Sequence, residues 1–134
     1  MSGPRILVVD DDPDIQDYFG FLLEDNGYLV RSAENAEIAL QIIDGFAPDA
    51  VLIDVMMPGR SGLDLLVNLR RDSRWTNTPV LMITGNDKVL EDDCHSYLSA
   101  HGDVRYPDAV LAKPIDRDVM LETLGKLCPA NTSS

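Results

Sequence analysis

A chain of 134 residues with 45% hydrophobic and 25% charged residues has the size and composition of one globular domain. Its formal net charge of −12 excludes the basic footprint that direct binding to nucleic acid requires. No apolar run approaches the ~20 residues of a membrane span, and Met1–Arg5 lacks the basic segment and cleavage site of a signal peptide. We therefore expect a cytoplasmic protein that contacts neither nucleic acid nor membrane directly.

Strand-like and helix-like segments alternate along the chain. Uninterrupted apolar runs such as Ile6–Val9 and Ala50–Ile53 are typical of strands buried on both faces of a parallel sheet. Apolar residues spaced three and four apart indicate helices that pack one face on a core. The predicted strands are Arg5–Asp10, Tyr28–Ala33, Ala50–Asp54, Pro79–Thr84 and Ala109–Ala112. The predicted helices are Pro13–Asp25, Glu34–Phe46, Gly62–Arg71, Lys88–Ala100 and Asp116–Leu127.

Local signals mark the ends of these elements. Asp12 followed by Pro13 is typical of a helix N-cap and first helical residue, and Ser61 is expected to cap the third helix. In the first helix the expected core-facing residues include Tyr18. The strand Tyr28–Ala33 is more polar than the others, which predicts a place near an edge of the sheet.

The alternation predicts an α/β fold of the flavodoxin-like (βα)5 type, doubly wound, with helices on both faces of the sheet. Five parallel strands fit the order 2-1-3-4-5, in which the first and third strands flank the switch point. One domain is expected over residues 1–134, with a core of about residues 5–127 and a frayed C-terminal tail over 129–134.

Polar residues follow the buried strands at their carboxyl ends, the edge where ligands bind in such sheets. Asp10 and Asp11 end the first strand, Asp54 the third, Thr84 the fourth and Lys113 the fifth. Clustered carboxylates repel one another unless a cation offsets the repulsion. Hard oxygen ligands without Cys or His favour Mg²⁺, with Mn²⁺ as a substitute.

A carboxylate beside a metal can attack phosphorus and form an aspartyl phosphate. The metal, the hydroxyl of Thr84 and the ammonium of Lys113 would then bind the equatorial oxygens of the phosphoryl group. The sequence contains no Gly-rich nucleotide cradle of the two common kinds. The pattern therefore predicts metal-assisted phosphoryl transfer to an aspartate.

These motifs resemble the receiver domain of two-component response regulators. The matching pieces are Val-Val-Asp-Asp ending at Asp11, Asp54-x-x-Met-Pro-Gly-x-x-Gly, Thr84, and Lys113-Pro114. They follow the family's order and cover the chain from about Arg5 to Leu127.

The resemblance implies a metal site with assigned ligands. Asp54 matches the phosphoacceptor and a metal ligand. Asp11 matches the direct ligand of the acidic pair, Asp10 a ligand through water, and the main-chain carbonyl of Met56 the third protein ligand. Asp12 is expected to serve as the helix N-cap.

The resemblance also implies a switch region. Thr84 matches the hydroxyl that moves toward the phosphoryl group, and Lys113 the lysine that pairs with it. Gly85 leaves the site open, and Pro114 matches the usual cis-proline position. Val110 departs from the pattern, because receivers often carry Tyr or Phe there as a rotamer switch.

The implied function is that of a phosphorelay switch. A histidine kinase or histidine phosphotransfer protein would donate a phosphoryl group to Asp54, and the face of the last two strands and helices would change conformation. That face would contact an unidentified downstream protein or a second copy in a homodimer. The chain would be a signalling switch and not an enzyme, although it would catalyse its own phosphorylation and, slowly, its dephosphorylation.

Two other functions remain open at this point. A receiver-like interaction module that signals without phosphorylation is favoured by Val110 and by the long segment 101–108. A phosphatase of the haloacid dehalogenase type is disfavoured, because Met56 stands where that family has a second aspartate. A stand-alone receiver and one part of a longer protein both fit the sequence.

Overall fold

The computed structural model describes residues 4–54, 61–84, 108–112 and 116–127, with only the backbone at 61–63, 84 and 112. The strands are β1 (Arg5–Val9), β2 (Leu29–Ala33), β3 (Ala50–Asp54), β4 (Val80–Thr84) and β5 (Ala109–Ala112). The helices are α1 (Pro13–Asp25), α2 (Ala36–Phe46), α3 (Ser61–Arg71) and α5 (Arg117–Leu127). None of the helices within these ranges is long and apolar enough to span a bilayer.

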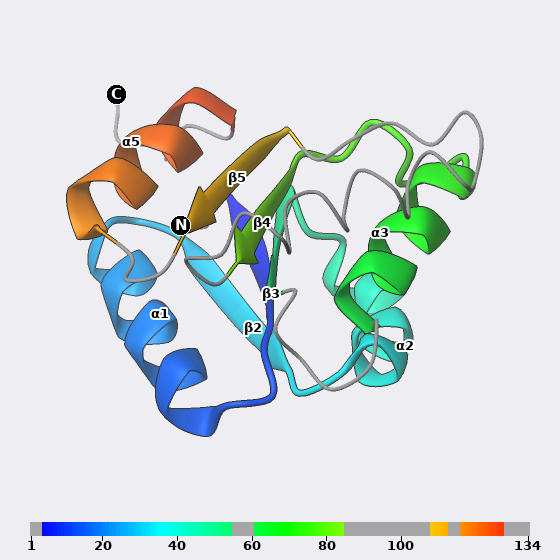
Figure 1. Ribbon diagram of the computed structural model, residues 1–134, viewed down its shortest axis with the longest axis horizontal. Coiled ribbons are helices and arrows are strands. Elements are labelled where there is room, and N and C mark those ends of the chain that lie inside the picture. The colour runs from blue at the N-terminus through cyan, green and yellow to red at the C-terminus, as the bar shows by residue number, and fades with distance from the viewer. Residues whose placement is uncertain (1–3, 55–60, 85–107, 113–115, 128–134) are drawn as a thin grey trace.

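The strands form one sheet in the order β2-β1-β3-β4-β5, and every neighbouring pair is parallel. The predicted fold class and strand order are confirmed. Figure 1 shows α1 and α5 covering one face of the sheet and α2 and α3 the other. The helix predicted over Lys88–Ala100 lies outside the described residues.

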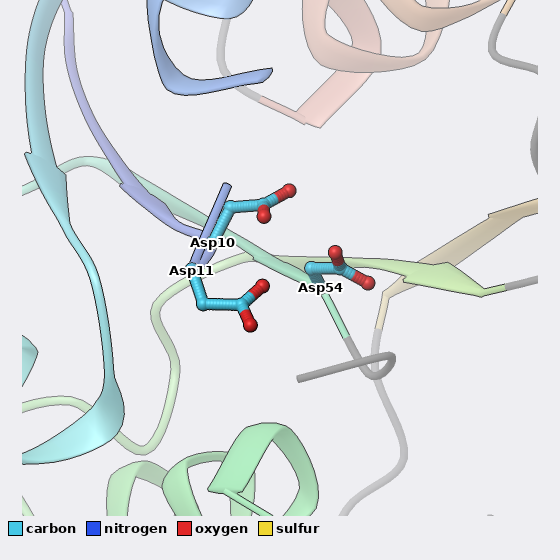
Figure 2. Close-up of side chains that lie close together, drawn as sticks. All are labelled: Asp10, Asp11 and Asp54. Carbon is cyan, nitrogen blue, oxygen red and sulfur yellow. The ribbon is translucent and has the colours of Figure 1, made fainter. Parts of the chain in front are cut away.

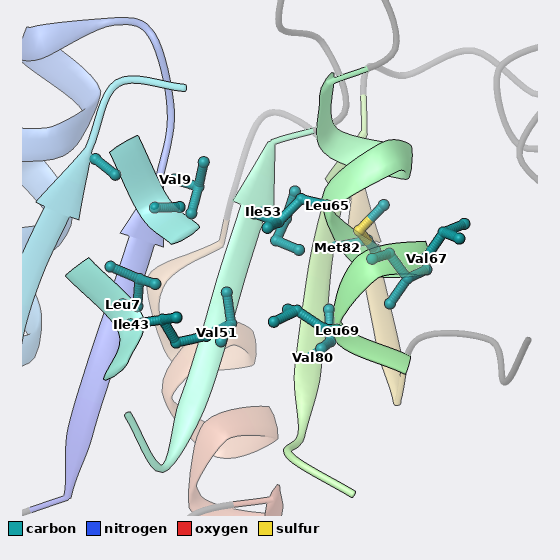
Figure 3. Close-up of a cluster of buried hydrophobic side chains, with 13 residues drawn as sticks. Leu7, Val9, Ile43, Val51, Ile53, Leu65, Val67, Leu69, Val80 and Met82 are labelled. Carbon is teal, nitrogen blue, oxygen red and sulfur yellow. The ribbon is translucent and has the colours of Figure 1, made fainter. Parts of the chain in front are cut away.

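Two apolar clusters, one on each face, form the core. Successive strand side chains point to opposite faces, so β1, β2, β3 and β4 contribute to both clusters, whereas β5 packs only against the second. The cluster drawn in Figure 3 joins alternate residues of β1, β3 and β4 to α2 and α3. The second joins the intervening strand residues to α1 and α5. All five residues of β3 are buried, which explains why its sequence lacks polar alternation.

The strand β2 lies at an edge, as its polarity predicted. It pairs only with β1, and its residues alternate between exposed and partly buried until Ala33. Leu29, the first residue of the strand, is 38% exposed. Its polar positions therefore face solvent and not a neighbouring strand.

The structure confirms the predicted N-cap of α1 and corrects the predicted start of α2. The Asp12 carboxylate accepts a hydrogen bond from the Asp14 amide (2.9 Å), which confirms Asp12 as the N-cap of α1. Helix α2 begins at Ala36 instead of Glu34, because Asn35 is its N-cap and accepts from the Ile38 amide.

Two further expectations were wrong. Helix α3 begins at Ser61 itself, one residue before the predicted start, within the usual uncertainty of helix ends. Tyr18 is 44% exposed, because the buried stripe of α1 is centred on Phe19, Leu22 and Leu23 and leaves Tyr18 at its margin.

Candidate functional site

The register of the sheet places Asp10 beside Asp54. Val9 of β1 lies opposite Ile53 of β3, so the next residues of these two strands are neighbours. Asp10 directly follows β1, and Asp54 is the last residue of β3. The parallel arrangement therefore brings together two carboxylates that are far apart in the sequence.

Asp11 completes a cluster of three carboxylates. One carboxylate oxygen from each of Asp10, Asp11 and Asp54 lies within 4.8 Å of the others. Figure 2 shows the three side chains converging at the carboxyl ends of the strands. Asp10 is 1% and Asp54 3% exposed, whereas Asp11 is open to solvent. The cluster thus has a buried floor and an accessible side.

Backbone and side-chain hydrogen bonds hold Asp10 in place. Its Oδ1 accepts from the Asp12 amide (2.9 Å), and its own amide donates to the Ala33 carbonyl (3.0 Å). The side-chain amide of Gln16 donates to the Asp10 carbonyl. Gln16 could not be identified from the sequence, because a glutamine near the start of a helix carries no signal that distinguishes it from a surface residue.

The donor set fits a small hard cation. Three unit charges at this separation repel by on the order of 1–3 kcal/mol per pair at the effective dielectric constants of protein surfaces. All three donors are carboxylate oxygens, the ligands that Mg²⁺ and Mn²⁺ prefer. No His or Cys joins the group in the part of the chain that the structure describes, which disfavours a zinc site.

The remaining predicted site residues are only partly described. The backbone of Thr84 ends β4, and Asp54 lies opposite Ile83, so position 84 reaches the same edge as the carboxylates. Val110 lies in β5 opposite Met82 and is 41% exposed. Four residues lie outside the described residues: Met56, Gly85, Lys113 and Pro114.

Comparison with known proteins gives a family match over most of the chain. The family model of the response regulator receiver domain matches residues 6–125. The chain is 35% identical over 118 residues to the DNA-binding dual master transcriptional regulator RpaA of Synechocystis, covering 88% of this chain and 46% of RpaA. It is 39% identical over 101 residues to the phosphate regulon regulator PhoB of Escherichia coli, covering 71% of this chain and 44% of PhoB. The chain thus spans less than half the length of these relatives.

Solved structures agree with this match. The chemotaxis protein CheY4 of Vibrio cholerae superposes with a TM-score of 0.78 at 27% identity, covering 92% of this chain and 98% of CheY4. NtrX of Brucella abortus gives a TM-score of 0.76 at 29% identity, covering 95% of this chain and 27% of NtrX. The strand order, the acidic edge and the family model all agree, and the chain belongs to the response regulator receiver domain family.

Proposed function

We propose that the chain is the phosphoacceptor of a two-component phosphorelay and that Asp54 receives the phosphoryl group. The observation that carries the proposal is the position of Asp54 at the carboxyl edge of the sheet, within 4.8 Å of Asp10 and Asp11. A nucleophile needs such a place, beside a cation site and at the accessible edge of a parallel sheet.

The three carboxylates and the main-chain carbonyl of Met56 would hold Mg²⁺, or Mn²⁺ in its place. When bound, the cation offsets the carboxylate charges and draws negative charge from the phosphoryl oxygens. Asp11, the exposed member, would complete the site from the solvent side, while Asp12 and Gln16 keep Asp10 in position.

In the transfer step an Asp54 carboxylate oxygen forms a bond to phosphorus. The bond between phosphorus and the donor's leaving atom breaks, and its electron pair stays with the donor, a phosphohistidine of a histidine kinase or histidine phosphotransfer protein. The Thr84 hydroxyl and the Lys113 ammonium would bind the transferred group's oxygens. Water later cleaves the acyl phosphate slowly and restores Asp54.

The phosphoryl group would shift a two-state equilibrium, because Thr84 and Lys113 contact it in only one state. Gly85, Val110 and Pro114 belong to the same switch region. The changed face, formed by β4, β5, α5 and residues 88–100, would bind a downstream protein or a second copy of the chain. In this proposal the chain works in the cytoplasm as a signalling switch.

Intact-protein mass spectrometry after incubation with acetyl phosphate and Mg²⁺ tests the proposal. One phosphoryl adduct should form, and Asp54→Asn or a chelator should abolish it. Asp25→Asn, the same substitution at an exposed position at the end of α1, serves as the matched control and should leave the adduct unchanged. Absence of the adduct despite measured Mg²⁺ binding would favour a receiver-like module that signals without phosphorylation.

A further inference from the structure

A groove lies between α1 and the edge strand β2, on the side of α1 that faces away from α5. Its volume is about 210 Å³. Six of its lining residues are Asp17, Gly20, Phe21 and Glu24 of α1 and Val30 and Ser32 of β2. We call this feature the α1–β2 groove.

Two residues of this groove cost helix stability, and a third exposes a large apolar side chain. Gly20 lies inside α1, where glycine costs about 1 kcal/mol relative to alanine, although an added Cβ would meet nothing within 4 Å. Phe21 is 71% exposed, the highest value among the exposed large hydrophobic residues. Glu24 lies in the last turn of α1, where a negative charge opposes the helix dipole. Their convergence on one groove indicates a ligand.

The negative charge of the groove predicts a positively charged ligand. Four residues of α1 are acidic and none is basic: Asp14, Asp17, Glu24 and Asp25. Asp17 and Glu24 line the groove and form no ion pair among the described residues. Seven residues apart on one helix, they lie about 10 Å apart along its axis, with Gly20 and Phe21 between them. Two cations flanking one apolar side chain would complement this pattern.

The strand side of the groove can accept a peptide. The Leu29 amide donates to the Pro4 carbonyl, and the Ala33 carbonyl accepts from the Asp10 amide, so these groups point toward β1. Backbone groups alternate in direction along a strand, so those of Val30 and Ser32 point to the open edge. An extended segment in the groove therefore meets the apolar side chains of Phe21 and Val30 and also strand backbone that points away from β1.

We propose that the α1–β2 groove binds a basic peptide segment of a partner protein. One apolar side chain of the segment packs over Gly20 against Phe21, and two flanking Lys or Arg side chains pair with Asp17 and Glu24. Gln16 also lines the groove and donates to the Asp10 carbonyl, so the groove adjoins the carboxylate cluster but contains none of its three carboxylates. The proposal does not depend on phosphorylation of Asp54.

An NMR titration of the labelled protein with acetyl-Arg-Ala-Leu-Ala-Arg-amide tests the proposal. Saturating Mg²⁺ is present throughout, so that the peptide is not drawn to the carboxylate cluster. Amide shifts should change at residues 16–24 and 30–32, and the affinity should fall as salt is raised. The acidic peptide with Glu in place of Arg, and the basic peptide with Ala in place of Leu, should bind more weakly.

Two variants separate recognition from folding. Gly20→Ala fills the groove and Glu24→Gln removes one carboxylate; each should weaken peptide binding about two- to fivefold. Both should leave the melting temperature equal or higher, because each removes a destabilising feature of α1. Gly45→Ala and Glu37→Gln make the same changes on α2 and should bind as the unaltered protein does.

Four results would overturn the proposal. The first is equal binding of the acidic peptide, and the second is shifts confined to residues outside the groove. The third is unchanged affinity in both Gly20→Ala and Glu24→Gln. Shifts at residues 16–24 that appear on raising the protein concentration alone would identify a second copy of the chain as the occupant and would also contradict it.

Discussion

Each carboxylate of the acidic edge would stabilise a bound cation and destabilises the cation-free fold. One carboxylate oxygen from each of Asp10, Asp11 and Asp54 lies within 4.8 Å of the others, and Asp10 and Asp54 are buried. Coulomb repulsion at that distance opposes folding until a cation is bound. The most exposed member, Asp11, is the one whose charge can be removed with the least disturbance of packing.

Asp11→Asn should therefore raise the free energy of unfolding in the absence of Mg²⁺, by on the order of 1 kcal/mol. The same substitution should reduce the rise in melting temperature that saturating Mg²⁺ produces, because ligand binding to the native state is the source of that rise. Thermal unfolding with chelator and with Mg²⁺ measures both effects. A lower stability of Asp11→Asn in chelator would contradict the repulsion argument, and Asp25→Asn is the control.

The pKa of a second acidic residue, Asp72, is lowered by its neighbour Arg74. Hydrogen bonds from the Arg74 side chain lower the pKa of Asp72 below its ordinary value of 3.8, and the Arg74 amide adds to the effect. Arg74 also pairs with Asp44 at 2.8 Å. The ionised Asp72 carboxylate therefore stabilises the folded state at neutral pH, above the pKa that Asp72 has in the unfolded chain. This stabilisation is lost as the pH falls through the pKa of Asp72 in the folded state. Arg74 and Asp44 are exposed, and Asp72 is only partly covered, so the contribution is small.

Arg74→Ala should raise the pKa of Asp72 toward its ordinary value, as followed by NMR titration of the side-chain carboxyl carbon. Asp44→Asn removes the other partner of Arg74 and should leave most of the Asp72 shift in place. If the pKa of Asp72 were unchanged in Arg74→Ala, the main cause would lie outside this hydrogen-bonded pair.

At the scale of elements, one buried arginine joins α3 to the starts of β4 and β5. The Arg70 side chain is 1% exposed and contacts the Asp108 carboxylate at 3.0 Å. It also donates to the carbonyls of Thr78 (2.8 Å) and Thr76 (3.3 Å). Asp108 in turn accepts from the Val80 amide (2.8 Å). This network fixes the amino ends of the two strands that carry Thr84 and Val110 of the proposed switch region.

Arg70→Met should cost about 3 kcal/mol of unfolding free energy, because it leaves the partly buried Asp108 carboxylate and two carbonyls without their cation. Asp108→Asn keeps an acceptor for the Val80 amide but leaves the buried Arg70 cation without this carboxylate, so it should cost a similar amount. Urea unfolding of the two variants measures both losses. A much smaller loss in Asp108→Asn would show that the hydrogen bond to Val80, and not the charge of Asp108, carries its contribution.

The whole molecule has a stability gradient set by its sheet order. Strands β1 and β3 are inner strands with almost every side chain buried, whereas β2 has one neighbour and alternating exposure. Parallel strands buried on both faces can open only when the layers of helices separate. The acidic edge is thus built on the most stable part of the sheet, which keeps its carboxylates in place despite their repulsion.

Native-state hydrogen exchange should rank the strands accordingly. The amides of β1 and β3 should exchange only through global unfolding, and those of Val30 and Ser32 should exchange much faster, because they point away from β1 to the open edge and need no opening to meet water. Protection of Val30 and Ser32 comparable to that of β3 in dilute protein would show that another chain covers the edge of β2.

The fold class, the strand order and the three carboxylates could all be predicted from the sequence. Period-2 and period-3.6 patterns are local properties, and the apolar runs that end at Asp10 and Asp54 fix which residues reach the carboxyl edge. Local capping chemistry likewise identified Asp12. The prediction that Tyr18 faces the core was wrong, because the width of the buried stripe on a helix depends on how neighbouring elements pack.

Other contacts between residues far apart in the sequence could not be predicted in this way. Arg70 and Asp108 are 38 residues apart, and neither carries a local signal for the other. The α1–β2 groove likewise needs the side of a helix and the edge of a strand in one place. Such contacts are set by the packing of elements, which many different sequences satisfy, and so a single sequence does not specify them in advance.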